Sequence, residues 1–191
     1  MDPHGLALAY SLSTIAGLRA SLTVVAVSIA IHVHAFAPPP ELAWVGSNVT
    51  LAIAAAFAVA DFFGDKIPIV DHLVHVVHVA LAPVAGAIAA AGVDTSGATN
   101  VSALGIFGVL GGANALGVHG LRAATRGGSS AISAGALNPV LSLADDVVAV
   151  AGLALAFIAP IAVACVAAIA TIAFVLVARV AWNRRPRAAA R

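Results

Sequence analysis

The residues with the most chemical potential in this sequence are ionisable side chains that stand inside long apolar stretches. Arg19 is the sharpest example, because it lies near the middle of the first such stretch. A charge within a lipid bilayer is costly, so Arg19 needs either an anion or a water-filled cavity. Two interpretations stay open: a structural ion pair with a neighbouring helix, or a charge that binds a ligand or gates a pathway.

A second group lies in the third apolar stretch, where Asp71, His75 and His78 fall on one face of a helix at about 100° per residue. A carboxylate and imidazoles at this spacing can bind a divalent cation or relay protons. These three residues are therefore the candidate metal ligands of the chain. The alternative is a polar helix face that lines the interior of a bundle.

Asp145 and Asp146 form an adjacent acidic pair in the fifth apolar stretch. At a rise of about 1.5 Å per residue, Asp145 lies about 10 Å beyond the expected helix start at Asn138. Two adjacent carboxylates at that depth cannot both be ionised without a partner, so we expect one of them to be protonated. His75 lies at a similar depth if its helix starts near Pro68, so the two acidic faces could meet.

Five more polar residues complete the set of candidate binding or transport residues. Asp61 and Asp65 are one helical turn apart at the end of the second apolar stretch, next to Lys66. We interpret this end as an interfacial turn in which Lys66 pairs with one of the two acids. Asn114 and His119 add polar groups to the fourth stretch.

Composition places these groups in a membrane protein. Of 191 residues, 62% are hydrophobic and only 9% are charged, and the mean hydropathy is +1.07. Soluble domains average about a quarter charged residues. The net charge of +1 creates no field that would attract nucleic acid. The sequence therefore excludes a cytosolic enzyme, a nucleic-acid binder and a disordered chain.

A helix needs about 20 apolar residues to cross a bilayer. The sequence predicts an all-α, polytopic membrane helix bundle with six transmembrane helices: Gly5–Val33, Trp44–Phe63, Pro68–Gly92, Ser102–Ala124, Asn138–Phe157 and Ala159–Trp182. Asn138 reads as a helix N-cap, Pro160 marks the last turn, and Arg126–Ser129 reads as a loop. Gly111 and Gly112 either break the fourth helix near a ligand or allow close helix packing, and we favour packing.

Basic residues set the expected orientation. The basic tail, residues 183–191, should be cytoplasmic, and with six spans the amino terminus is cytoplasmic too. Lys66, Arg122 and Arg126 then fall on the cytoplasmic side, whereas the expected outer loops, 33–43 and 92–101, contain no lysine or arginine. We expect a multi-pass protein of the bacterial inner (cytoplasmic) membrane.

The chain reads as one transmembrane domain, residues 1–191, in which two halves, 1–97 and 98–182, could form a 3+3 inverted repeat. Gly17-Leu18-Arg19-Ala20 recurs as Gly120-Leu121-Arg122-Ala123, and Ala60-Asp61 recurs as Ala144-Asp145. Such short matches also arise by chance in an alanine-rich chain, so the repeat stays an open alternative.

The stretch Asp61-Phe62-Phe63-Gly64-Asp65-Lys66-Ile67-Pro68-Ile69-Val70-Asp71 resembles the signature of a bacterial integral-membrane family labelled domain of unknown function 4126. The resemblance covers most of the chain and includes His78, Pro83, Ala85-Gly86-Ala87, His119, Arg126, Asn138, Asp145, Asp146 and Gly17-Leu18-Arg19-Ala20. The family often has an acid in place of His75 and a basic residue in place of Ala82. The resemblance implies a membrane protein and supplies no activity.

Three functions follow from these observations. The first is a small transporter or ion-translocating protein for a cation or a proton-coupled small solute, since acids outnumber bases in the polar region. The second is a structural or accessory membrane subunit, whose buried charges fix the helix register. The third is an intramembrane metal-dependent lipid hydrolase, which is the one enzyme among the three and the least favoured. We expect no cofactor other than a bound cation, and as partners the lipid bilayer, a small solute or ion, and a second copy in a homodimer.

Overall fold

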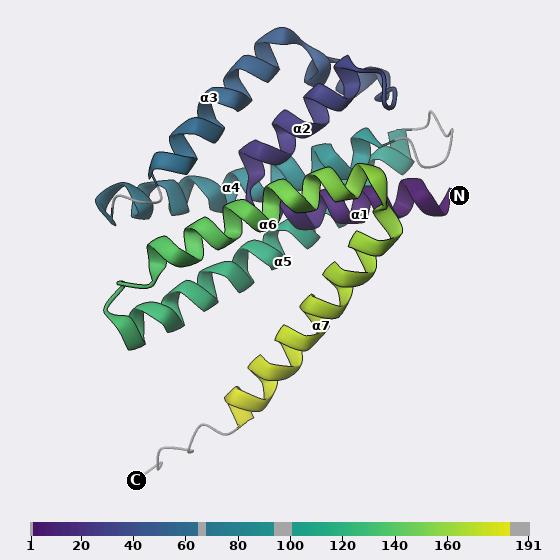
Figure 1. Cartoon of the computed structure of the whole chain (residues 1–191). Helices are drawn as coiled ribbons and strands as arrows, with labels where there is room; N and C mark the ends of the chain where they lie inside the picture. The colour runs from purple at the N-terminus through teal and green to yellow at the C-terminus, as the bar shows by residue number, and fades with distance from the viewer. Residues whose placement is uncertain (1, 65–67, 94–100, 184–191) are drawn as a thin grey trace.

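The computed structural model describes residues 2–64, 68–93 and 101–183, without the side chains of residues 68–75, 101–104, 178 and 181–183. Every regular element in these ranges is a helix (Figure 1), which confirms the all-α prediction. The elements are α1 (Pro3–Leu18), α2 (Ala20–His32), the 3-10 helix η1 (Pro40–Gly46), α3 (Asn48–Gly64), α4 (Pro68–Gly92), α5 (Val101–Ser133), α6 (Asn138–Ile158) and α7 (Pro160–Asn183).

Two of these helices, α6 and α7, are long and apolar enough to cross a membrane. The bent pair of η1 and α3 would add a third span if its two parts, which meet at 59°, cross together. The helix α2 and residues Val76–Gly92 of α4 are apolar but shorter. The structure thus supports a membrane-associated helical bundle, and the number of six spans stays a prediction.

The first predicted span is not one helix, because the chain breaks at Arg19. This residue has φ −142° and ψ 85°, which lies outside the helical region. Its N–H still donates to the Ile15 carbonyl at 2.8 Å, and its carbonyl accepts from the Thr23 N–H at 3.1 Å. The interruption therefore involves a single residue, after which α2 takes a different direction from α1 (Figure 1).

Helix boundaries elsewhere follow the prolines more closely than the glycines. The predicted bounds of α4 are correct, and Pro160 begins α7 as expected. The predicted loop at Arg126–Ser129 is wrong, since α5 continues to Ser133 and the turn comes at Ala134 and Gly135, which both have positive φ.

Asn138 is the first helical residue of α6 rather than its N-cap. The prediction fails because the side chain is used elsewhere. The Asn138 Nδ2 donates to the Ser130 Oγ at 2.9 Å and so ties the start of α6 to the end of α5.

Close packing of α4 on α5 confirms the packing interpretation of the glycines. A Cβ placed on Gly86 would lie 2.6 Å from the Gly111 carbonyl oxygen, and one on Gly111 would lie 2.5 Å from the Gly86 carbonyl oxygen. The two backbones therefore touch at this crossing. The helix α5 runs through Gly111 and Gly112 without a break.

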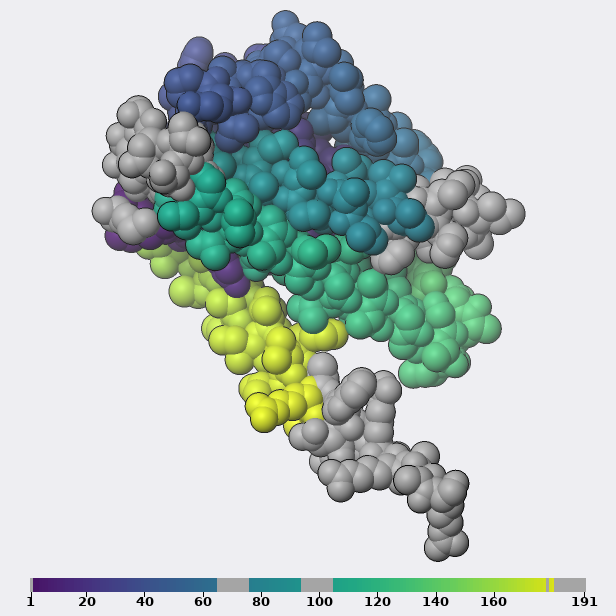
Figure 2. Space-filling model, turned by 180° about the vertical axis from the view of Figure 1, so that it is seen from behind, coloured from purple at the N-terminus to yellow at the C-terminus, as the bar shows by residue number. Residues whose placement is uncertain are grey.

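The core surrounds α1, in which nine of the 16 residues are buried. Leu12 and Ile15 of α1 belong to one apolar cluster with Leu153 of α6 and Val27 of α2. The helix α7 contacts α1 and α6 near its start and then stands away from the rest of the bundle (Figure 2). The region around the α1–α2 break is thus enclosed by helices, whereas α7 leaves an open side.

Candidate functional site

Arg19 lies at the centre of the candidate site and is 1% exposed. Its Nη2 lies 2.6 Å from the Asp146 Oδ1 of α6 and also donates to the Ser142 Oγ at 3.0 Å. Ser142 and Asp146 are one turn apart on the same face of α6. The structure therefore gives Arg19 the structural ion pair that was one of its two interpretations.

A second buried pair joins α3 to α4. The His78 Nε2 lies 3.0 Å from the Asp61 Oδ2, and the same carboxylate oxygen accepts a hydrogen bond from the Ser21 hydroxyl. Asp61 is 6% exposed and His78 is 2% exposed. Ser21 lies in the first turn of α2, where the helix dipole stabilises a nearby anion. The break at Arg19 thus creates a helix start that faces Asp61.

Two imidazoles meet next to this pair. The rings of His78 and His119 pack edge to face, with their centroids 6.2 Å apart. His119 of α5 is buried as well. Asp61, His78 and His119 therefore form a row of titratable groups that crosses from α3 through α4 to α5.

One cavity connects the two buried pairs. It has a volume of about 260 Å³, and its lining includes Arg19, Ser21, Asp61 and Asp146. Apolar side chains complete its walls: Leu22, Ala58, Val59, Phe62, Phe63 and Val150. Arg19 at the break, Asp61 of α3 and Asp146 of α6 therefore border one space whose wall is mostly apolar, and the second interpretation of Arg19, a charge that binds a ligand, stays untested.

Asp145 has a different partner from its neighbour Asp146. The Arg122 Nε lies 2.7 Å from the Asp145 Oδ2, and the Arg126 Nη2 lies 3.5 Å from the same oxygen. Both aspartates thus face a guanidinium. A guanidinium is the kind of partner that two adjacent carboxylates need at that depth, and the expectation that one of them is protonated stays untested.

Several predicted residues take other positions or lie outside the description. Asp65, Lys66 and the side chains of Asp71 and His75 fall outside the described residues. The expected pairing of Asp61 or Asp65 with Lys66 therefore stays untested, although the partners found for Asp61 are Ser21 and His78. Among the described residues, no three His, Cys, Asp or Glu side chains are arranged to hold a metal ion.

Asn114 does not line the cavity. Its Nδ2 donates to the Ser13 Oγ at 2.8 Å and to the Thr14 Oγ1 at 2.9 Å, which joins α5 to α1. The polar face of α4 was expected to meet the acids of α6. His78 of that face contacts α3 and α5 instead.

Two residues of the site were not predicted from the sequence. Ser142 and Ser21 donate or accept hydrogen bonds at the two buried pairs, yet serine is common in membrane helices and carries no charge. One signal was present for Ser142, because it precedes Asp146 by four residues and so shares its helix face.

Comparison with known proteins agrees with the family resemblance. No curated protein and no solved structure matches the chain. A family profile described as domain of unknown function (DUF4126) matches residues 6–180, which include every helix that lines the cavity. The protein therefore belongs to the family defined by this domain of unknown function.

Proposed function

We propose that the protein is a small membrane transporter that moves protons, or a small solute coupled to protons or a cation, through the pocket at the α1–α2 break. The observation that carries the proposal is the cavity lined by Arg19, Asp61 and Asp146. Discontinuous helices whose half-helix ends face a polar pocket are a recurrent plan of secondary transporters.

The Asp61–His78 pair is suited to hold a transferable proton. A carboxylate and an imidazole 3.0 Å apart can share one proton, which resides on either partner. Gain or loss of this proton changes the balance of charge beside the pocket. The neighbouring His119 ring extends the row toward α5.

The Arg19–Asp146 pair can couple that proton to helix position. The pair holds the break of the first span against α6, with Ser142 as a second anchor. A solute or ion that enters the cavity competes for these groups, and any change in the pairing moves α1, α2 or α6. Alternating access moves one group of helices against another around such a site.

The proposal places the protein in the bacterial inner membrane with both termini cytoplasmic. The arginines of α5 and of the carboxyl-terminal tail then face the cytoplasm, as the positive-inside rule demands.

Liposomes that contain the purified full chain and a pH-sensitive dye test the proposal. Under an imposed potential, with a panel of cations and small solutes, the wild-type protein is expected to acidify or alkalinise the lumen. Asp61→Asn should reduce this flux at least tenfold, because an amide cannot exchange the proton. Glu41→Gln, which removes an exposed carboxylate from η1, is the matched control and should retain the flux.

One observation favours a second function, that of a structural or accessory subunit. Arg19 and Asp146 pair with each other, and Asp61 contacts His78, as expected if buried polar groups fix the helix register. This function predicts no flux from the wild-type protein for any ion or solute, and a loss of stability alone in Asp61→Asn.

A further inference from the structure

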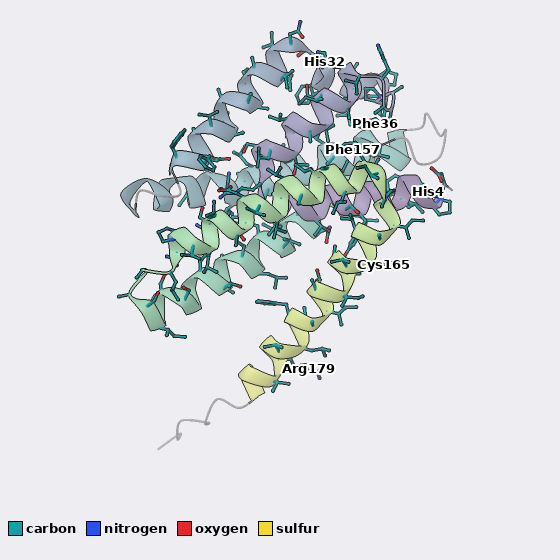
Figure 3. The ribbon with its side chains drawn as sticks, viewed as in Figure 1. His4, His32, Phe36, Phe157, Cys165 and Arg179 are labelled. Atoms are coloured by element: carbon teal, nitrogen blue, oxygen red, sulfur yellow. The ribbon has the colours of Figure 1, made fainter. Side chains whose placement is uncertain are left out.

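A larger cavity lies between α7 and the rest of the bundle. It has a volume of about 610 Å³ and is bounded by α1, α5, α6 and α7. The cavity exists because α7 diverges from the bundle after its start at Pro160; Figure 3 labels Cys165 and Arg179 along this diverging helix. We call this space the α7 groove.

The walls of the α7 groove are apolar over most of its length. Ile15, Val148 and Leu155 form one side, and Val166 and Phe174 of α7 form the other. A volume of about 300 to 1,000 Å³ with apolar walls is typical of sites that enclose a small organic ligand. The groove does not include Arg19, Asp61 or Asp146, so it is separate from the pocket described above.

One part of the groove is polar and rich in arginine. Arg122 and Arg126 are one turn apart on α5, and Thr125 lies between them; all three line the groove together with Asp145 of α6. Two guanidiniums therefore face one carboxylate among the described lining residues. A guanidinium carries five N–H donors, so it can hold a carboxylate and a phosphate at once.

The two arginines stand where α5 passes from an apolar to a polar sequence. Beyond Arg126, α5 continues with Gly127, Gly128, Ser129 and Ser130, a polar run that does not favour the hydrocarbon core. The apolar part of the groove lies on the other side of the arginines along α5 and includes Val118 and Leu121. The groove thus changes from apolar to cationic in the same order as a phospholipid changes from chain to phosphate.

From this match we propose that the α7 groove binds an anionic phospholipid. One acyl chain lies along α7, and the phosphate accepts hydrogen bonds from Arg122 and Arg126. Arginine pairs with phosphate in a bidentate geometry, and basic pockets between membrane helices bind acidic lipid headgroups. The lipid fills the space that α7 leaves open and so holds α7 to the bundle.

Spin-labelled phosphatidylglycerol and phosphatidylcholine provide the test, with the full chain reconstituted in phosphatidylcholine liposomes. The electron paramagnetic resonance spectrum gives the association of each label with the protein. We expect a several-fold preference for phosphatidylglycerol, which Arg126→Gln reduces toward one. Equal association of the two labels with the wild-type protein would overturn the proposal.

A matched pair of tryptophan variants keeps the test independent of the ion pairs. Ala170 is exposed on α7 and lines the groove, whereas Ala173 is exposed on α7 and does not. Ala170→Trp should fill the groove and remove the preference, and Ala173→Trp should leave it unchanged, with equal helix content by circular dichroism. The same effect of both variants would contradict lipid binding in the groove. The readout involves no flux, so it is independent of the proposed transport.

Discussion

The tetrapeptide Gly-Leu-Arg-Ala occurs twice in the chain, and its two copies fold differently. At residues 17–20 the helix ends at Leu18 and a new helix begins at Ala20, with Arg19 outside the helical region. At residues 120–123 the helix α5 continues without a break. Since the local sequence is the same, the conformation of Arg19 comes from its tertiary contacts.

Both arginines bind one member of the same aspartate pair. Arg19 lies 2.6 Å from Asp146, and Arg122 lies 2.7 Å from Asp145. The side chains of the first pair are 1% and 9% exposed, whereas those of the second are 6% and 23% exposed. Adjacent residues of a helix point about 100° apart, so α6 presents one carboxylate to the pocket at the α1–α2 break and the other to the α7 groove. Similar ion pairs thus stand in two environments, and their energies should differ.

The largest expected effect comes from the more enclosed pair. Arg19→Met leaves the Asp146 carboxylate buried without its guanidinium, and removal of one partner of a buried pair costs about 3 to 5 kcal/mol. Chemical denaturation of the protein in detergent, followed by circular dichroism, measures this loss. The double variant Arg19→Met/Asp146→Leu should recover most of the stability, because both charges are gone. A double variant as unstable as the single one would show that the cost does not come from the unpaired carboxylate.

A smaller loss is expected from the second pair. Asp145→Asn weakens the hydrogen bonds to Arg122 and Arg126, and hydrogen bonds to charged groups contribute about 1.5 to 3 kcal/mol. Water reaches this more exposed pair and compensates part of the loss. In the same denaturation experiment, Asp145→Asn should therefore be more stable than Arg19→Met. The reverse order would refute the contrast between the two environments.

Much of the helical framework was predictable from the sequence, since apolar length and proline set it. Pro68 and Gly92 bound α4 as predicted, and Pro160 separates α6 from α7. The break at Arg19 was not predictable, because its partners Ser142 and Asp146 are more than 120 residues away in the chain. The glycine pair after Arg126 misled the prediction, because glycine permits a turn but does not require one.

The sequence singled out the charged residues of the buried pairs, but it did not show which residues contact each other. The need of Arg19 for an anion or a water-filled cavity followed from the cost of a charge in a bilayer, and the structure supplies the anion, Asp146. Helical spacing shows which residues of one helix share a face, but not which other helix that face meets. His78 was therefore grouped with its sequence neighbours, whereas the structure pairs it with Asp61 of α3.

The smallest expected effects come from the glycines of the two tetrapeptides, Gly17 and Gly120, which differ in the space around them. A Cβ on Gly17 would lie 2.5 Å from the Ala115 carbonyl oxygen, whereas a Cβ on Gly120 would meet no atom within 4 Å. Gly17→Ala forces α1 away from α5, and such overpacking costs about 1 to 3 kcal/mol. Gly120→Ala should instead add about 1 kcal/mol, because alanine favours an exposed helix position. If Gly17 marks a contact between the two helices, the two variants therefore shift the denaturation midpoint in opposite directions. A gain in stability from both variants would mean that α1 and α5 do not touch at this point.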